Sequence, residues 1–417
     1  MSDGAIDLKA EARARAFSIP LAEINVAEDE LYRADTWGPY FERLRSEAPV
    51  HRYEHPELGT FWSITRYHDI VAVDSNHQDF SSRGSIVLED QADDFNTPMF
   101  IAMDPPKHDE QRKTVSPALS PSNLANMEPL IRERAGKILD ELPVGEVFDW
   151  VDKVSIELTT MTLATLFDFP FEERRKLTRW SDVITAPEGA PGFGTEDERR
   201  AELFECVGYF TNLWNERVNA QPKGDLISMM AHSDATRHMD QMEFLGNLIL
   251  LIVGGNDTTR NTISGSIVAL NTFPEQYAKL KADPGLLPSM VSETIRWQTP
   301  LSYMRRTATR DVEMHGQTIR AGEKVAMWYI SGNRDETVIE NPNAYVIDRE
   351  RPRQHVSFGF GIHRCVGNRL AELQLKVIWE EIMRRFPTIE LAGEPIRIAS
   401  SFIHGYAELP VLIPARN

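Results

Sequence analysis

The sequence contains very little cysteine, with only Cys206 and Cys365 among its 417 residues. Two cysteines cannot build the disulfide framework of a small secreted protein, so we expect a reducing, cytoplasmic environment. Cys206 lies in an amphipathic helical pattern over residues 201–218, and we interpret it as a small core residue. Cys365 is therefore the cysteine to which we assign a chemical role.

The chain also lacks a long apolar stretch at its N-terminus, because residues 1–15 are polar and charged. This pattern predicts neither a signal peptide nor a membrane anchor. No linker, repeat or low-complexity stretch marks a boundary, so we expect one domain over residues 1–417. The net charge of −18 argues against nucleic-acid binding.

Helical periodicity dominates residues 107–297 and 366–386, whereas β-rich segments are predicted at about residues 50–65, 305–330 and 388–415. The strands cluster towards the two ends of the chain and do not alternate with the helices, so a parallel α/β sheet is not expected. We predict a mainly α protein with small β-sheets, and we interpret residues 81–106 as a long functional loop.

Cys365 follows a glycine-rich stretch, Phe358–Arg364, and precedes a predicted helix that begins near Asn368. A thiolate there would accept backbone N–H bonds and face the positive end of the helix dipole. Both effects are expected to lower the thiol pKa below its usual value of about 8.5. A thiolate of this kind is a good axial ligand for haem iron. The alternative is an inert cysteine buried beside a turn.

The spacing F-x-x-G-x-H-x-C-x-G, which runs from Phe358 to Gly367, resembles the haem-binding loop of the cytochrome P450 family. The resemblance implies the P450 fold, with a long central helix over haem b (iron protoporphyrin IX). It implies that Cys365 binds the iron and that Phe358 and His363 lie beside the cofactor. It also implies a monooxygenase that uses O2 as co-substrate.

Residues 242–270 are apolar on nearly every side, which predicts a helix that is buried all round. Two glycines in its middle, Gly254 and Gly255, cost about 1 kcal/mol each relative to alanine. Their presence predicts close approach of a flat ligand, and we assign Gly255 to the cofactor site. The alternative is a kinked core helix with a capping aspartate.

Asp257 and Thr258 follow these glycines. The segment resembles the family's G-x-[DE]-T pattern in the helix over the haem. The resemblance implies that Thr258 hydrogen-bonds dioxygen and that Asp257 helps to deliver protons.

Glu293 and Arg296 resemble the family's E-x-x-R helix, which implies a buried structural network. The third member of that network is an arginine before the cysteine loop, and the spacing does not decide between Arg349 and Arg351. The resemblance further implies that four residues bind the haem propionates. They are His108, Arg112, Arg306 and His363.

The chain has no glycine fingerprint for a flavin or nicotinamide and no cysteine spacing for an iron–sulfur cluster. Electrons must therefore come from another protein, and a [2Fe-2S] ferredoxin with its reductase is the partner that the resemblance implies. A basic patch near Cys365 predicts a docking face for an acidic partner. The patch comprises Arg349, Arg351, Arg353 and Arg364. The alternative is a solvated arginine-rich loop.

Residues 254–261, 347–381 and 402–408 resemble the bacterial branch of the family that hydroxylates medium-chain n-alkanes at the terminal carbon, whose members also oxidise fatty acids at the omega position. An apolar pocket suits such substrates. The resemblance implies a lining of Leu250, Leu251, Val253, Ile86, Val87, Leu88, Leu301, Ser302, Phe402 and Ile403. The alternatives are terpene or steroid hydroxylation, a peroxide-driven haem-thiolate enzyme and a non-catalytic haem sensor.

Overall fold

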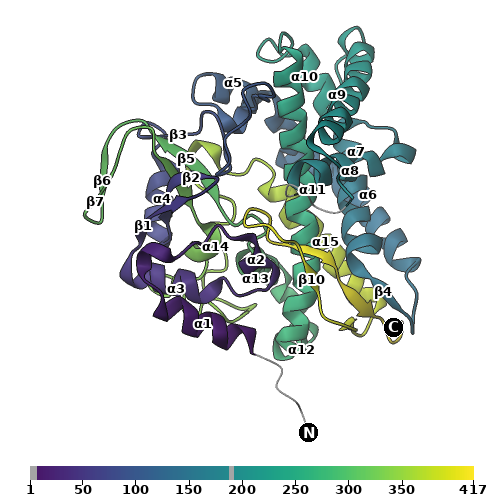
Figure 1. Cartoon of the computed structure of the whole chain (residues 1–417). Coiled ribbons are helices and arrows are strands. Elements are labelled where there is room, and N and C mark those ends of the chain that lie inside the picture. The colour runs from purple at the N-terminus through teal and green to yellow at the C-terminus, as the bar shows by residue number, and fades with distance from the viewer. Residues whose placement is uncertain (1–6, 187–191) are drawn as a thin grey trace.

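The computed structural model describes residues 7–186 and 192–417. Long helices gather on one side of the molecule and the larger sheet lies on the other (Figure 1). The helices are α1 (Leu8–Ser18), α2 (Asp29–Arg33), α3 (Gly38–Glu47), α4 (Tyr67–Ser75), α5 (Lys107–Val115), α6 (Pro121–Asp140), α7 (Glu157–Phe167), α8 (Arg175–Thr185), α9 (Glu196–Val218), α10 (Leu226–His232), α11 (Gln241–Thr272), α12 (Pro274–Ala282), α13 (Leu287–Gln298), α14 (Tyr329–Gly332) and α15 (Asn368–Arg385).

The strands form four small sheets. The largest has the order β1-β2-β8-β5-β3, and the others are β4-β12-β9, β10-β11 and β6-β7. The strands are β1 (Val50–His55), β2 (Gly59–Ile64), β3 (Phe80–Ser81), β4 (Val147–Asp149), β5 (Met304–Ala308), β6 (Val312–Met314), β7 (Gln317–Ile319), β8 (Lys324–Met327), β9 (Glu390–Leu391), β10 (Ile396–Arg397), β11 (Tyr406–Glu408) and β12 (Pro410–Leu412). The prediction of a mainly α protein with small sheets is confirmed.

The central helix α11 passes through the middle of the molecule (Figure 1). Asp240 caps its N-terminus, because the carboxylate accepts a 2.8 Å hydrogen bond from the backbone N–H of Glu243. Most of its 32 residues are buried, as expected for a helix that is apolar on all sides. This helix carries the glycines, Asp257 and Thr258 that the sequence marked as candidates.

One strand lies where only helix was predicted. β4 falls within residues 107–297, and that prediction is wrong at this point. β4 pairs antiparallel with β12, from Val147 opposite Leu412 to Asp149 opposite Pro410. A three-residue strand has no periodicity of its own, so its partner near the C-terminus determines its conformation.

Residues 81–106 are largely irregular, with one short 3-10 turn at Phe100–Ala102. The loop contacts α11 at two adjacent positions of that helix. The backbone N–H of Phe100 donates to Oδ1 of Asn247 at 3.0 Å, and a Cβ on Gly246 would lie 2.2 Å from the carbonyl oxygen of Pro98. These contacts hold the loop against the central helix one turn before Leu250.

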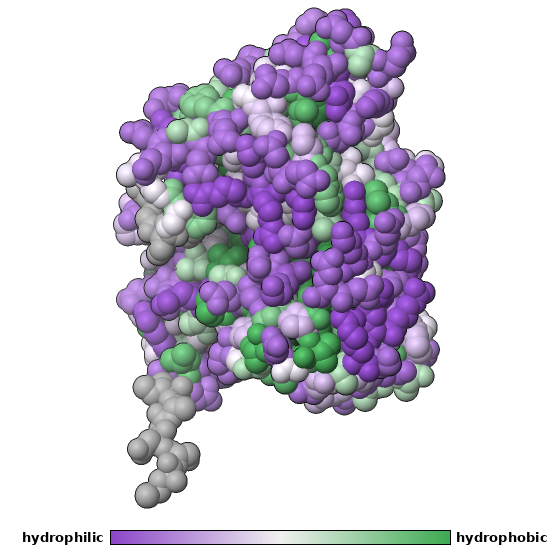
Figure 2. All heavy atoms as spheres, turned by 90° about the vertical axis from the view of Figure 1, so that its right-hand side faces the viewer, coloured by the Kyte–Doolittle hydropathy of each residue, from purple (hydrophilic) through white to green (hydrophobic). Residues whose placement is uncertain are grey.

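The face on the side of α6 and α9 is mainly hydrophilic, with a few apolar patches among the hydrophilic residues (Figure 2). This surface agrees with the 63 acidic and 45 basic residues of the chain. Within residues 7–186 and 192–417, no helix combines the length and the apolar character needed to cross a bilayer.

Candidate active site

Cys365 lies in a tight loop that directly precedes α15. Its backbone N–H donates to the carbonyl oxygen of Phe358 at 2.8 Å, which closes the loop. Gly359 and Gly361 have φ angles of +63° and +65°, in the left-handed region that favours glycine. A Cβ on Gly361 would lie 2.5 Å from the carbonyl oxygen of Asp74. The loop therefore needs glycine for its conformation and for its contact with α4.

The electrostatic surroundings of Cys365 differ from the sequence-based expectation. Burial raises the pKa of the thiol, while the backbone N–H groups of Gly367 and Asn368 and the charges of Arg112 and Arg364 oppose this shift without reversing it. Without a bound metal, the predicted lowering of the thiol pKa is therefore wrong. That prediction included the backbone amides and the helix dipole but left out the desolvation of the thiolate. A metal cation bound to the sulfur would favour the thiolate.

A stripe of accessible positions runs along the otherwise buried α11. Leu250, Gly254 and Thr258 follow at intervals of four residues and so share one helix face. A Cβ on Gly254 would meet no atom within 4 Å, so open space adjoins the helix there. The Cys365 side chain also has exposed surface, although it lies deep among surrounding protein atoms. Both observations fit a flat haem held inside the fold.

The Cβ direction of Gly255 does not face that space. A Cβ on Gly255 would lie 2.6 Å from Cδ2 of Leu163 on α7. The assignment of Gly255 to the cofactor site is therefore corrected. Its missing side chain allows two helices to pack closely, whereas Gly254 is the glycine beside the open space.

Thr258 and Asp257 point to different surroundings. The Thr258 hydroxyl donates to the carbonyl oxygen of Gly254 at 3.0 Å, on the accessible stripe. Asp257 is fully buried and pairs with Arg260 at 2.8 Å. Arg260 also pairs at 2.8 Å with Asp182, whose side chain is 30% exposed. Burial raises the pKa of Asp257 despite the attraction of Arg260. Asp257 thus lies at the inner end of a polar connection to the surface.

His108 and His363 lie together, with ring centroids 4.2 Å apart. Nε2 of His108 and both ring nitrogens of His363 are buried and have no hydrogen-bond partner among the described residues. Buried polar atoms of this kind usually have a partner. These unpaired nitrogens fit a carboxylate from a bound cofactor. Arg112 lies nearby and donates to the carbonyl oxygen of Arg364.

Arg306 differs from the simple clamp that the resemblance implied. Its Nη2 donates to Oδ1 of Asp74 at 2.7 Å, and its Nη1 donates to the carbonyl oxygen of Arg305 at 2.8 Å. The guanidinium is buried and already has an anionic partner. A haem propionate would therefore share Arg306 with Asp74.

Asp74 was missed in the sequence analysis. It lies on α4 next to Ile70 and Val73, and all three side chains are buried. Its Oδ2 accepts hydrogen bonds from the backbone N–H of Phe360 at 2.7 Å and from the Tyr329 hydroxyl at 2.9 Å. The available signal was a charged residue on the apolar face of a predicted helix.

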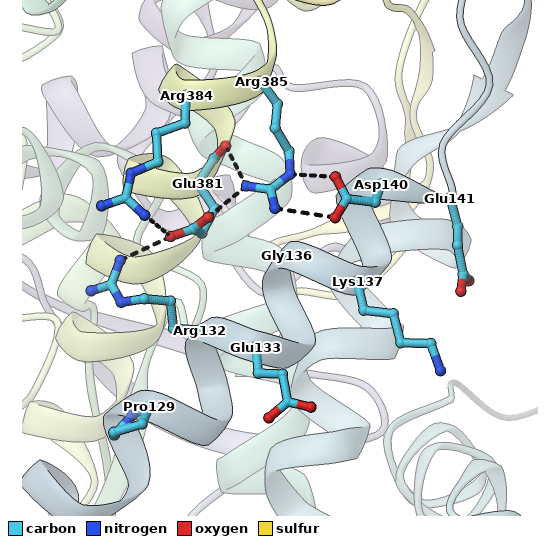
Figure 3. A pocket seen from close by; sticks show the side chains of 10 residues that line it. All are labelled: Pro129, Arg132, Glu133, Gly136, Lys137, Asp140, Glu141, Glu381, Arg384 and Arg385. Atoms are coloured by element: carbon cyan, nitrogen blue, oxygen red, sulfur yellow. Dashed lines mark hydrogen bonds and ion pairs between the residues drawn. The ribbon is translucent and has the colours of Figure 1, made fainter.

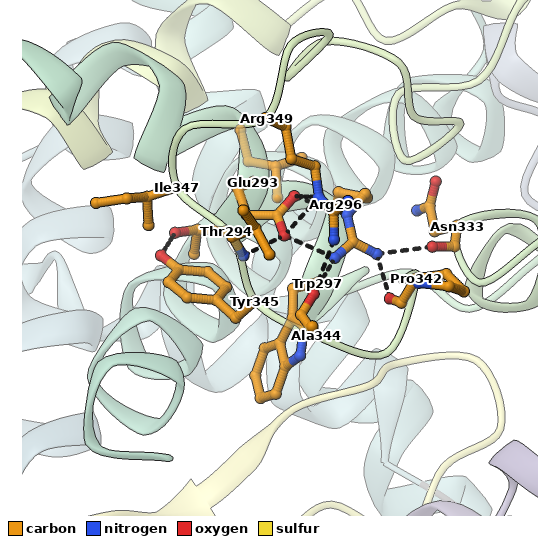
Figure 4. Close-up of polar contacts among 12 residues, drawn as sticks. Glu293, Thr294, Arg296, Trp297, Asn333, Pro342, Ala344, Tyr345, Ile347 and Arg349 are labelled. Carbon is orange, nitrogen blue, oxygen red and sulfur yellow. Dashed lines mark hydrogen bonds and ion pairs between the residues drawn. The ribbon is translucent and has the colours of Figure 1, made fainter. Parts of the chain in front are cut away.

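Glu293 and Arg296 form a buried network on α13 (Figure 4). Arg296 donates to the Glu293 carboxylate through Nε at 2.7 Å and through Nη2 at 2.8 Å. The same guanidinium donates to backbone carbonyl oxygens of Asn333, Pro342 and Ala344. The network therefore ties α13 to the segment that leads to the cysteine loop.

The structure distinguishes the two arginines that the spacing left open. Nε of Arg349 donates to both carboxylate oxygens of Glu293, at 3.0 and 2.9 Å, whereas Arg351 is exposed. Arg349 has only 12% of its side chain exposed, so it does not belong to the predicted basic patch. The other three arginines of that patch are exposed, namely Arg351, Arg353 and Arg364.

A second ionic network holds α15, the helix that follows Cys365, against α6 (Figure 3). Glu381 is 5% exposed and pairs with Arg132 at 3.0 Å and with Arg384 at 2.7 Å. Arg385 bridges Glu381 and Asp140, at 2.5 and 2.7 Å. These charges line an open groove. Because each of these charges has an oppositely charged partner, we interpret the network as structural support for α15.

The segments proposed for the substrate pocket lie side by side at several points. The backbone N–H of Arg305 donates to the carbonyl oxygen of Ile86 at 2.8 Å, and that of Ser302 donates to Phe402 at 2.9 Å. Leu301 pairs with Ile403 in an isolated bridge. The candidates that retain accessible surface are Ile86, Val87, Leu250, Leu251, Val253, Leu301 and Phe402.

Three pocket candidates are instead enclosed by protein. Leu88 and Ser302 are 0% exposed and Ile403 is 2% exposed, so their side chains present almost no surface to a ligand. Leu88 packs in an apolar cluster that also contains Tyr303 and Trp328. Their assignment to the pocket lining is corrected, because the same apolar character serves the core.

Comparisons with known proteins agree on one family. Residues 285–401 match the cytochrome P450 family. Linalool 8-monooxygenase from Pseudomonas putida is 36% identical over 92% of this chain and 97% of that protein. Methyl-branched lipid omega-hydroxylase from Mycobacterium tuberculosis is 31% identical over 94% of this chain and 96% of that protein.

Solved structures show the same relationship. CYP153D17 from Sphingomonas sp. PAMC 26605 is 54% identical with a TM-score of 0.87, over 93% of this chain and 98% of that chain. Cytochrome P450-153 from Novosphingobium aromaticivorans is 48% identical with a TM-score of 0.87, over the same shares. The cysteine loop, the central helix and these similarities together show that the chain belongs to the cytochrome P450 family and is a monooxygenase.

Proposed function

We propose that this enzyme inserts one oxygen atom of O2 into the terminal C–H bond of a medium-chain n-alkane or fatty acid. The observation that carries the proposal is the accessible apolar surface that Leu250, Leu251 and Val253 present on α11, next to Gly254. An alkyl chain suits an apolar lining with few polar groups. The relative named methyl-branched lipid omega-hydroxylase supports attack at a chain end.

The runner-up is hydroxylation of a terpene or steroid by the same mechanism. Two relatives favour it, linalool 8-monooxygenase and the steroid C26-monooxygenase of Mycolicibacterium smegmatis. A peroxide-driven enzyme is less well supported, because Asp257 and Thr258 form the acid–alcohol pair that delivers protons in the oxygen-using enzymes that this segment resembles. A non-catalytic haem sensor is the least supported alternative, because the relatives are monooxygenases.

The proposed cofactor is haem b. Cys365 would bind its iron, and His108, His363, Arg112 and Arg306 would bind its propionates, with Phe358 beside the ring. When bound, the haem supplies O2 activation, and a thiolate ligand favours O–O cleavage. The unpaired buried nitrogens of His108 and His363 support this arrangement.

The proton path that we propose uses the polar connection of Asp257. Arg260 pairs with both Asp182 and Asp257 and holds the two carboxylates in place, while it keeps its own proton. Burial raises the pKa of Asp257 and so favours the protonated carboxyl, which is the form that could donate a proton inward. The Thr258 hydroxyl, now on the Gly254 carbonyl oxygen, would hydrogen-bond O2 and pass the proton to it.

Replacing Thr258 with alanine is expected to preserve haem binding but to divert electrons into hydrogen peroxide. Product formed per electron pair should fall about a hundredfold, at the lower end of the range for a lost proton-transfer group. Product and peroxide are measured together against consumption of the electron donor. Thr258→Ser, which keeps the hydroxyl, should stay near wild type. Fully coupled turnover in Thr258→Ala would refute the assigned role.

The electron donor that we propose is a [2Fe-2S] ferredoxin served by its reductase in the cytoplasm. Arg351, Arg353 and Arg364 form an exposed basic patch beside the cysteine loop. On a chain with a net charge of −18, such a patch favours an acidic partner and steers its approach.

A substrate titration of the holoenzyme tests the proposed specificity. Octane, octanoic acid, a monoterpene and a steroid are added separately, and the haem spin state is followed by absorbance. We expect octane or octanoic acid to bind about tenfold more tightly than the other two, a difference of ~1.4 kcal/mol. Tightest binding of the monoterpene or the steroid would favour the runner-up and overturn the aliphatic proposal.

A further inference from the structure

A single buried carboxylate connects three parts of the molecule that lie far apart in the sequence. Asp74 on α4 is 2% exposed, and an unpaired charge there would be strongly unfavourable. Its carboxylate accepts hydrogen bonds from Arg306 on β5 at 2.7 Å, from Tyr329 on α14 at 2.9 Å and from the backbone of Phe360 at 2.7 Å. The buried negative charge of Asp74 is therefore compensated by Arg306 and by two further hydrogen-bond donors.

The cysteine loop is shaped around this residue. A Cβ on Gly359 would lie 2.9 Å from Oδ2 of Asp74, and one on Gly361 would lie 2.5 Å from its carbonyl oxygen. Both glycines have positive φ angles. The loop thus follows the surface of Asp74 four to six residues before Cys365, which limits how the cysteine can be placed.

Asp74 also determines which donors of Arg306 stay free. A guanidinium has five N–H donors in a fixed plane. Asp74 and the carbonyl oxygen of Arg305 each take one through the two terminal nitrogens. The remaining donors can bind a second anion, and their direction is fixed because the first pair is short and buried.

We propose that Asp74 is a positioning residue of the haem site, which orients Arg306 toward a haem propionate and braces the loop that carries Cys365. The inference rests on the proposed haem ligation and not on the proposed substrate. It adds an anion to a site for which the resemblance implied only cationic and neutral partners.

Asp74→Asn separates the charge from the shape of the side chain. Removing a negative charge near the haem favours the added electron of the ferrous state, so the reduction potential should rise. A tenfold change in the equilibrium constant of one-electron reduction corresponds to 59 mV, and we expect a shift of about that size. Transfer of haem to apomyoglobin should become about tenfold faster, because Arg306 loses its fixed direction.

Two matched variants serve as controls. Asp69→Asn removes a carboxylate from the same helix, where Asp69 pairs with His315 at 2.8 Å, and should change neither quantity. Tyr329→Phe removes one hydrogen bond to Asp74 without changing the charge. It should leave the potential unchanged and alter haem transfer by less than about threefold.

A double-variant cycle tests whether Asp74 acts through Arg306. Haem transfer from Asp74→Asn/Arg306→Gln should match that from Arg306→Gln within about twofold, because the two residues act as one unit. This double variant leaves neither partner of the buried pair charged, so it also decides the matter if Asp74→Asn alone does not fold. Multiplicative effects of the two substitutions would overturn the proposal.

The outcomes distinguish this inference from the proposed function. If wild type binds haem through sulfur and Asp74→Asn behaves like Asp69→Asn in potential and haem transfer, only the inference about Asp74 is overturned. If wild type does not bind haem through sulfur, the proposed ligation and this inference are both overturned. The substrate titration has no bearing on either result.

Discussion

Replacing Glu293 with glutamine is expected to lower the free energy of unfolding by about 3–5 kcal/mol, the usual effect of removing one partner of a buried ion pair. Glu293 is 0% exposed and Arg296 is 1% exposed, so the substitution leaves a buried guanidinium without its counter-charge. With about 2.1 cal/mol/K of unfolding entropy per residue, the melting temperature should fall by roughly 3–6 °C. Thermal unfolding of the holoenzyme measures this change.

The matched control for Glu293 is Arg351→Gln. Arg351 is the arginine that the sequence could not distinguish from Arg349, and it is exposed. Its replacement should change stability by less than about 0.5 kcal/mol, whereas Arg349→Gln should be clearly destabilising, because Arg349 binds both carboxylate oxygens of Glu293. Equal melting temperatures for the Glu293 and Arg351 variants would contradict the structural role of the network.

Replacing Cys365 with serine is expected to reduce product formation to the background level. A serine hydroxyl has nearly the shape of the thiol, so the loop should keep its conformation. It lacks the electron donation by which a thiolate promotes O–O cleavage. Product formation with saturating electron donor and haem content per chain are measured on the same sample, so that loss of chemistry is separated from loss of cofactor.

Cys206→Ala is the control for that experiment. Cys206 is fully buried in the main apolar cluster, and burial strongly raises the pKa of its thiol, which makes it unreactive. The Cys206 variant should keep the turnover of wild type, with some loss of stability from the small cavity. Normal turnover in Cys365→Ser would remove the basis for assigning the iron ligand.

The sequence allowed prediction of those features whose signal is local and long. The apolar run around Leu248 predicted the central helix, and α11 extends only slightly beyond residues 242–270 at each end. The predicted helix after Cys365 corresponds to α15. In both cases a hydrophobic pattern over many residues determines the element.

Features that depend on distant partners could not be predicted. β4 exists because β12 pairs with it across more than 260 positions of sequence. The role of Asp74 depends on its hydrogen bonds with Arg306 and Phe360. Both residues lie far from it in the sequence, and no motif spacing connects them. Similarly, the choice between Arg349 and Arg351 depends on which side chain reaches Glu293, a matter of chain path and not of residue type.

Two of the four corrected site assignments, those of Gly255 and Leu88, have a shared physical origin. Gly255 was assigned to the cofactor because glycine permits close approach, but the group that approaches it is Leu163. Leu88 was assigned to the pocket because it is apolar, but it packs in the core. The residue type limits which groups can pack against a position. The fold determines whether that group is a ligand or another part of the protein.

The central claim is that the sulfur of Cys365 binds haem iron, and the absorbance spectrum of the reduced holoenzyme under carbon monoxide tests it most directly. We predict a Soret band strongly shifted to the red in wild type, as expected for a thiolate ligand, and loss of that band in Cys365→Ser. A wild-type band at the position typical of a histidine ligand, unchanged in Cys365→Ser, would contradict the claim.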